Sequence, residues 1–180
     1  MTLPQWQWID TEAALATLCQ RSRDEEYVVL DTEFVRTRTY HAQLGLVQLY
    51  NGTDLALIDP LAIQDLTPLW QLIADETVVK VLHSPSEDLE IFAHLGGVVP
   101  QPLFDSQTAG VLLNLGAPMG YGKLVHHYLG LELDKGESRT EWLKRPLSSA
   151  QLQYAAADVY YLHQIYPQMR AQITAMGRLD

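Results

Sequence analysis

Several features are scarce in this 180-residue sequence, and each scarcity excludes a class of protein. There is one cysteine, Cys19, so the sequence excludes an internal disulfide and a multi-cysteine zinc site. No apolar run approaches the roughly eighteen residues of a membrane span, and the first ten residues lack the basic and apolar segments of a signal peptide. We therefore expect a cytoplasmic protein without membrane association, in which Cys19 is a packing residue.

Basic residues are also few, with 12 Lys and Arg against 22 Asp and Glu, for a net charge of −10. Broad attraction to nucleic acid requires the opposite balance, so charge alone argues against a protein that binds nucleic acid over its whole surface. It does not exclude an enzyme whose local charge is inverted by bound cations. The sequence has no internal repeat or low-complexity linker, and its 47% hydrophobic content suits one domain with a buried core.

Residue patterns predict a hairpin followed by alternating strands and helices. Asn51-Gly52 is a strong turn signal between two apolar runs. The predicted strands are 27–34, 44–52, 54–60, 78–83 and a short one before Asp105. The predicted helices are 11–21, 66–74, 84–97, 106–115, 121–130 and 148–169. This order predicts an α/β fold with a mixed five- or six-stranded sheet flanked by helices.

Two of the predicted helices begin with a capping-box pattern. Ser84 and Glu87 have the required spacing, with Pro85 suited to the first turn. Ser148 and Gln151 have the same spacing at the start of the last helix. We expect both serines to accept a hydrogen bond from the backbone of the first helical turn.

The sequence VVLDTEF, residues 28–34, places two carboxylates at the end of an apolar strand. Asp31 and Glu33 share a face, because strand side chains alternate, and two like charges partly out of water are costly unless something offsets them. Asp88 falls in the first turns of a predicted helix, and Tyr154 and Asp158 lie four residues apart on one face of the last helix. If the four carboxylates converge, their oxygens suit hard divalent cations.

Each of these features also has a structural explanation. An Asp-x-Glu pair can be a salt-bridged strand edge, Asp88 can favour the positive end of its helix, and Tyr154 and Asp158 can form a structural hydrogen bond. Spacing alone does not show that they converge. If they do, two cations about 3.5–4 Å apart would activate a water for phosphodiester cleavage. Tyr154, with an ordinary pKa near 10, would orient that water rather than deprotonate it.

Taken together, these segments resemble a known family. LDTEFVRTRTY, LGLVQLY, LALIDPL, HSPSEDLEIF and YAAADVYYL are similar, in that order, to the catalytic domain of ribonuclease D. That family belongs to the DEDD superfamily of 3′-to-5′ exonucleases and has a ribonuclease H-like fold. The resemblance includes LDKGESRTEWLKRPLS and extends over about residues 10–169.

The resemblance implies a role for each acidic residue. Asp31 and Glu33 match the first motif, Asp88 the second and Asp158 the third, all as metal ligands. Tyr154 matches the tyrosine of the DEDDy branch. The DEDDh branch has histidine one position earlier, where this sequence has glutamine.

The implied reaction is hydrolysis of the terminal phosphodiester at single-stranded RNA 3′ ends, with Mg²⁺ or Mn²⁺ and release of nucleoside 5′-monophosphates. The family's substrates include transfer RNA precursors and small structured RNAs. The family normally continues into helical HRDC domains, whereas this chain stops at Asp180. We expect one exonuclease domain, residues 1–180, without HRDC domains, and a monomer. Pro85 stands where a small residue such as glycine is expected, with little effect anticipated on Asp88.

Three alternatives stay open. A DNA 3′-to-5′ exonuclease of the proofreading type would use the same carboxylates, and no motif reports recognition of the 2′-hydroxyl. A non-catalytic RNA-binding module and a purely structural cation site are the others.

Several neighbouring residues also have two interpretations. Arg36 and Arg38 either meet phosphates, or lie in a solvated turn or a structural ion pair. The basic residues of the 134–145 loop either contact RNA or do not; they are Lys135, Arg139, Lys144 and Arg145. We expect Trp142 to pack under this loop, His83 to be a hydrogen-bonded strand-end residue, Asp105 to cap the next helix, and His126-His127 to lie on a helix surface.

Overall fold

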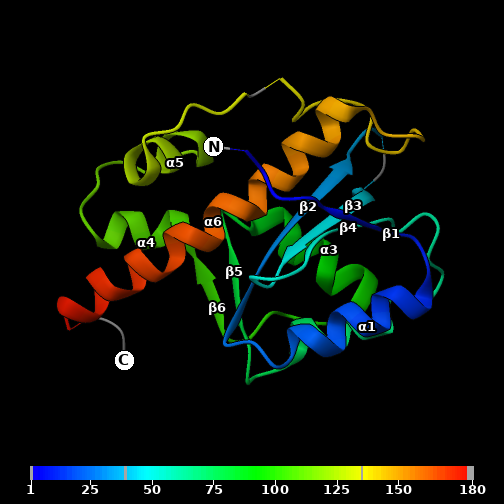
Figure 1. Ribbon diagram of the computed structural model, residues 1–180, viewed down its shortest axis with the longest axis horizontal. Helices are drawn as coiled ribbons and strands as arrows, with labels where there is room; N and C mark the ends of the chain where they lie inside the picture. Colours follow the sequence, from blue (N-terminus) through cyan, green and yellow to red (C-terminus); the bar gives the residue numbers. More distant parts are fainter. Residues whose placement is uncertain (1, 39, 135, 178–180) are drawn as a thin grey trace.

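Six strands form one mixed sheet, and helices cover both of its faces (Figure 1). The computed structural model describes residues 2–38, 40–134 and 136–177. The strands are β1 (Gln7–Ile9), β2 (Tyr27–Val35), β3 (Gln43–Tyr50), β4 (Leu55–Ile58), β5 (Val79–Leu82) and β6 (Leu103–Asp105). Their order is β1-β4-β3-β2-β5-β6. The two pairings made by β3 are antiparallel and the other three are parallel, which confirms the predicted mixed sheet.

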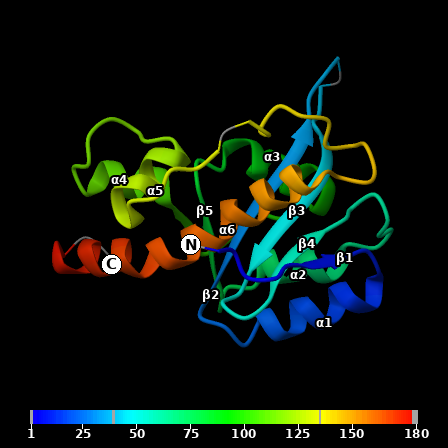
Figure 2. The same cartoon turned by 45° about the horizontal axis from the view of Figure 1, so that its top comes forward.

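The helices divide into two groups. On one face lie α1 (Glu12–Ser22), α2 (Thr67–Ala74) and α3 (Ser86–Gly96), and on the other lie α4 (Ser106–Leu112), α5 (Tyr121–Leu129) and α6 (Ser149–Ala175) (Figure 2). The helix α6 crosses the sheet over β2 and β3. In the described part of the chain, no helix is long and apolar enough to cross a bilayer.

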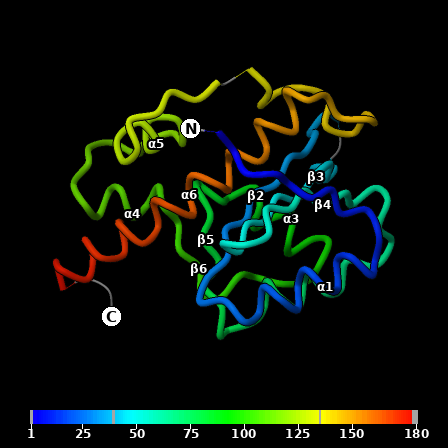
Figure 3. Tube along the Cα trace, in the orientation of Figure 1, coloured from blue at the N-terminus to red at the C-terminus, as the bar shows by residue number. Residues whose placement is uncertain are grey.

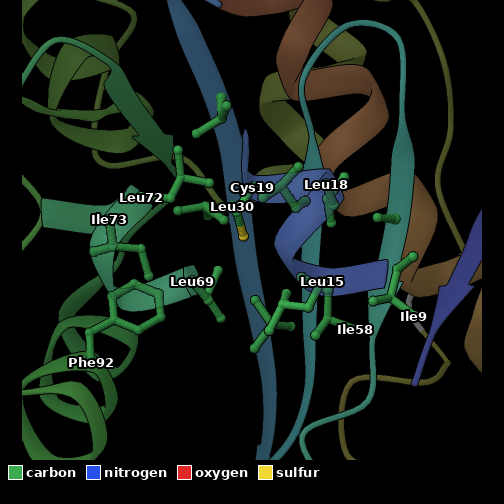
Figure 4. Close-up of a cluster of buried hydrophobic side chains, with 14 of the residues drawn as sticks. Ile9, Leu15, Leu18, Cys19, Leu30, Ile58, Leu69, Leu72, Ile73 and Phe92 are labelled. Carbon is green, nitrogen blue, oxygen red and sulfur yellow. The ribbon is translucent and has the colours of Figure 1, made fainter. Parts of the chain in front are cut away.

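Strand β2 separates the two cores. Val28 and Leu30 point into the core under α1, α2 and α3, whereas Val29 points into the core under α4, α5 and α6. Figure 4 shows part of the first core, including Cys19. The Cys19 side chain is buried, and this burial raises its pKa to about 12, so the prediction of a packing residue is confirmed. Because β2 alternates, Asp31 and Glu33 continue on the side of Val29, toward α6.

One of the two predicted capping boxes is wrong. The helix α3 begins at Ser86, its N-cap is Pro85, and no side chain caps it. Ser84 instead has a φ of +51°, and Glu87 pairs with Arg36 at 3.3 Å. The capping box of α6 is confirmed: Ser148 Oγ accepts from Gln151 N at 3.1 Å, and Gln151 Oε1 accepts from Ser148 N at 2.9 Å.

The largest differences from the predicted boundaries are at two helix ends, and one strand was not predicted. The helix α6 continues through Pro167 to Ala175, and α4 stops at Leu112 because Asn114 adopts a φ of +59°. β1 was not predicted, because three residues are too short to show an alternating pattern. The segment before β1 runs past α5 and α6 (Figure 3), and Leu3 packs against the core beneath those helices.

Candidate active site

Three of the predicted acidic residues converge at one point between the sheet and α6. Oxygens of Asp31, Glu33 and Asp158 all lie within 4.8 Å of one another. They line a cavity of about 210 Å³ that also contains Tyr154 and is flanked by Leu30 and Leu162. The strand places the first two carboxylates on one face, and α6 brings the third across from them.

Small residues let α6 approach the sheet. Ala155 and Ala156 are fully buried, and Ala155 packs with Leu46 and Leu57 of β3 and β4. Tyr154 and Asp158, on the same face of the helix, therefore reach the sheet beside Asp31 and Glu33 in the second half of β2. Larger side chains in place of the alanines would hold the helix, and Asp158, away from the strand.

Asp88 is near the other carboxylates but outside the group of three. It is buried on α3, and its carboxylate accepts a hydrogen bond from the hydroxyl of Thr32. Thr32 lies between Asp31 and Glu33 on β2, so its side chain points to the opposite face of the sheet. Asp88 still contributes to raising the pKa of Asp31 through their like charges.

Burial raises the pKa of all four carboxyl groups, and mutual repulsion adds to the effect for Asp31, Glu33 and Asp158. Burial raises the pKa of Glu33 to about 9, and the charge of Asp31 adds to the effect, although a hydrogen bond from Gln48 Nε2 at 3.1 Å opposes it. Burial, followed by the charge of Asp158, raises the pKa of Asp31 well above its usual range. Burial, followed by the charge of Glu33, also raises the pKa of Asp158 well above its usual range.

The pKa of Asp88 rises less, to about 6, chiefly through burial. None of the ion pairs among the described residues joins Lys or Arg to any of the four carboxylates. The charge conflict must therefore be offset by protons or by cations. Oxygen donors this close together fit a hard divalent cation.

Tyr154 stands beside this cluster with a protonated phenol. Burial and the charges of Asp158 and Glu33 raise its pKa further above the usual value. Its ring lies 6.2 Å, centroid to centroid, from that of Trp142, which is fully buried. The prediction that Trp142 packs under the 134–145 loop is therefore confirmed.

A bulge in β3 receives this loop. Glu33 pairs with Leu46 and Phe34 with Leu44, so Gly45 is the extra residue in β3. The carbonyl of Gly45 accepts from Arg145 Nη2 at 2.6 Å. Arg145 also binds the Asp59 carboxylate at 2.8 Å and the Trp142 carbonyl at 2.7 Å.

Among the basic residues with two interpretations, Arg36 and Arg145 have the contacts expected of structural residues, and RNA contact stays a prediction for the exposed ones. Arg36 forms ion pairs with Glu87 and Glu90, both at 3.3 Å. Arg145 is a structural residue, as its contacts show. Arg38, Arg139 and Lys144 are exposed, and Lys135 lies outside the described residues.

The histidine predictions are confirmed. His83 is hydrogen-bonded through both ring nitrogens, to Ser106 Oγ at 2.8 Å and to the Met119 carbonyl at 3.0 Å. His126 is exposed on α5 and pairs with Glu132 at 3.3 Å, and His127 is exposed beside it.

Tyr121 and Thr32 were not predicted from the sequence. The Tyr121 hydroxyl donates to the Ala157 carbonyl at 2.7 Å, one residue before Asp158. Tyr121, Tyr154 and Asp158 line both the carboxylate cavity and a larger groove of about 540 Å³. A tyrosine at the start of a predicted helix carries no signal of this role, because only tertiary packing brings α5 against α6.

Comparison with known proteins agrees with this geometry. A family model described as 3′-5′ exonuclease matches residues 6–174. Ribonuclease D of Shewanella sp. (strain ANA-3) is 52% identical over 98% of this chain and 46% of its own length. The chain thus spans about half the length of this curated relative.

Two solved structures are also similar. The crystal structure of Escherichia coli RNase D, described as an exoribonuclease involved in structured RNA processing, matches with a TM-score of 0.94 and 48% identity over 98% of this chain and 47% of that one. Brucella melitensis NrnC with bound Mg²⁺ matches with a TM-score of 0.73 and 27% identity over 87% and 78%. The ribonuclease H-like fold is confirmed. On this sequence and structural evidence, the chain belongs to the 3′-5′ exonuclease family.

Proposed function

We propose that this chain is the catalytic domain of a metal-dependent 3′-to-5′ exoribonuclease that removes nucleoside 5′-monophosphates from RNA 3′ ends. The observation that carries the proposal is the convergence of Asp31, Glu33 and Asp158, all with raised pKa values, beside the phenol of Tyr154. Glu33 is buried and Asp31 and Asp158 are half-buried, and none of them has a Lys or Arg partner among the described residues. Such a group of acids destabilises a protein, so a functional role explains it better than a structural one.

The donor set fits Mg²⁺ or Mn²⁺, and we propose Asp31, Glu33, Asp88 and Asp158 as the residues that hold two such cations. When bound, the cations would supply an activated water and stabilise the leaving oxygen. Asp88 completes the set from α3, where Thr32 fixes the direction of its carboxylate. Gln48 does the same for Glu33 from β3.

Tyr154 has a positioning task in this scheme. Its phenol stays protonated at neutral pH, so it can donate a hydrogen bond to the attacking water or to a phosphate oxygen, but it cannot act as a base. Trp142 and the loop held by Arg145 lie next to its ring and restrict its motion. The Leu162 side chain makes part of the cavity wall apolar, which limits competing water.

The groove of about 540 Å³ would receive the nucleotides that precede the scissile bond. It shares Tyr154 and Asp158 with the carboxylate cavity, and Gly120, Gly122 and Lys123 form part of its wall. Lys123 supplies a positive charge on this wall, where an RNA phosphate would need one. The RNA preference rests on the similarity to the ribonuclease D proteins.

Finer points belong to the same proposal. We propose transfer RNA precursors and other small structured RNAs with single-stranded 3′ ends as substrates, by similarity to ribonuclease D. We also propose that residues 1–180 act as one exonuclease domain, as a monomer in the cytoplasm.

The test is digestion of 3′-labelled single-stranded RNA and of the equivalent DNA, with Mg²⁺ or Mn²⁺. We expect labelled mononucleotide from RNA, its loss in Asp31→Asn, and unchanged release in Asp65→Asn, an exposed carboxylate outside the cavity. Preference for DNA would support the proofreading alternative. Metal-dependent RNA binding without cleavage by the wild type would support the non-catalytic module and contradict the proposal.

A further inference from the structure

The carboxylate of Asp105, at the end of β6, connects the turn before α3 with the first turn of α4. Its Oδ1 accepts from the backbone N–H of Ser84 at 2.9 Å and of Gln107 at 3.0 Å, and its Oδ2 accepts from Thr108 Oγ1 at 2.6 Å. We propose that Asp105 is a positioning residue, which holds the turn between β5 and α3 in the conformation that places Asp88. This inference rests on the proposed metal-binding role of Asp88.

The turn before α3 requires a stabilising contact, because the backbone conformation of Ser84 is unfavourable. Ser84 has a φ of +51°, in the left-handed region that residues with a Cβ avoid. The next residue is Pro85, and a residue before proline is driven toward extended conformations. The hydrogen bond from the Ser84 N–H to Asp105 opposes both preferences. Without it, we expect Ser84 to return to the extended region and the start of α3 to move.

The position of Asp88 depends directly on this turn, whereas the other three acids lie within a strand or a long helix. It is the third residue of α3, and α3 has no side-chain cap that would fix its first turn independently. The first turn is closed by the Leu89 N–H donating to the Pro85 carbonyl at 2.8 Å. Because Asp88 lies outside the group formed by Asp31, Glu33 and Asp158, a shift of α3 changes its distance to all three.

Ser106, the residue after Asp105, also contacts the segment that leads into α3. Ser106 Oγ lies 2.8 Å from His83 Nδ1 and 3.2 Å from the Leu82 carbonyl oxygen. His83 lines the carboxylate cavity and precedes Ser84. The beginning of α4 thus contacts three consecutive residues of the segment that leads into α3.

A simple capping role for Asp105 makes a different prediction. Asp105 caps α4 through Gln107 and Thr108, and loss of a cap alone would lower stability without changing cation affinity. If Asp105 positions Asp88, its removal should weaken cation binding, and a substitution at Ser84 that favours a positive φ should restore that binding. Glycine adopts a positive φ without strain, so Ser84→Gly should keep the turn in place when Asp105 is removed.

The experiment measures Mn²⁺ binding by calorimetry, together with thermal unfolding and release of 3′-terminal nucleotides. In Asp105→Ala we expect Mn²⁺ affinity about tenfold weaker, in the range found for groups that orient metal ligands. Asp105→Asn keeps an acceptor oxygen for Ser84 and should stay within about twofold of wild type. The double variant Asp105→Ala/Ser84→Gly should recover most of the affinity. Thr11→Ala, which removes the cap of α1, should lower stability only.

Ser84→Val tests the turn while leaving the cap of α4 intact. A β-branched residue strongly disfavours positive φ, so this variant should weaken Mn²⁺ binding about as much as Asp105→Ala. The inference is overturned if folded Asp105→Ala or Ser84→Val binds Mn²⁺ like wild type, or if Ser84→Gly fails to repair Asp105→Ala. Should Asp105→Ala not fold, Ser84→Val decides alone. If Asp105→Ala and Ser84→Val bind Mn²⁺ more weakly than wild type, but the wild type cleaves no RNA, the positioning role is upheld and the proposed activity is rejected.

Discussion

The metal-free protein should lose stability as the pH rises above neutrality, because the carboxyl cluster holds protons in the folded state that are released when the protein unfolds. Glu33 is 7% exposed, and its pKa is raised from 4.5 to about 9. Between these values the folded protein keeps a proton that the unfolded chain has lost. Its free energy of unfolding therefore falls by about 1.4 kcal/mol for each pH unit and each such proton.

The magnitude can be worked out for a window of about pH 7 to about pH 8.5. One proton gives a loss of about 2 kcal/mol across this window. A domain of this size changes its melting temperature by about 2–4 °C for each kcal/mol, so we expect a decrease of about 4–8 °C. Saturating Mn²⁺ should reduce the decrease, because a cation replaces the proton as the partner of the carboxylates.

The assay is thermal unfolding in EDTA, followed by circular dichroism, with Glu33→Gln as the matched control. The window lies above the titration of the half-buried histidines, His83 and His163, whose pKa values are lowered because their rings are partly removed from water. Burial lowers the pKa of Lys80 to about 8, so its titration makes the free energy of unfolding rise with pH. This contribution is the same in wild type and in Glu33→Gln and does not affect their comparison. Equal pH slopes for wild type and Glu33→Gln would refute the reasoning.

Three further predictions concern the residues around the cluster. Tyr154→Phe should slow nucleotide release about 10²-fold with an unchanged melting temperature, measured on 3′-labelled RNA, and an unchanged rate would contradict the positioning role of the phenol. Gly45→Ala should lower the free energy of unfolding by about 1–3 kcal/mol in urea titrations, because the added Cβ would lie 2.6 Å from the Trp142 carbonyl oxygen. Gly120→Ala, whose Cβ meets nothing within 4 Å, is its control. Lys123→Ala should reduce the slope of log(kcat/KM) against log salt by about 0.7 on single-stranded RNA and leave cleavage of a p-nitrophenyl nucleotide ester unchanged. An unchanged slope would remove Lys123 from the RNA path.

The parts of the site that follow a regular repeat could be predicted from the sequence. The alternation of β2 places Asp31 and Glu33 on one face, and the helical spacing places Asp158 on the same face of α6 as Tyr154. What could not be predicted depends on contacts between distant segments. The Thr32 hydroxyl reaches a residue 56 positions away.

The turn before α3 shows the same limit. The spacing of Ser84 and Glu87 favours a capping box, yet Ser84 adopts a positive φ, with its N–H bound to a carboxylate 21 residues away. A local pattern cannot include that competing partner. β1 is similar, since its three residues are recognisable as a strand only through their parallel pairing with β4.

The bulge at Gly45 limits how this domain can change in length. Deletion of Gly45 would restore regular pairing with β2 and would leave Leu44 and Gln43 opposite Phe34 and Val35, on their present faces of the sheet. The same deletion would remove the carbonyl that Arg145 binds. A deletion here would therefore disturb the loop that packs beside Tyr154, whereas the exposed turn at Gly52 is separated from that contact. Among relatives of this domain, we expect length variation to avoid this point of β3.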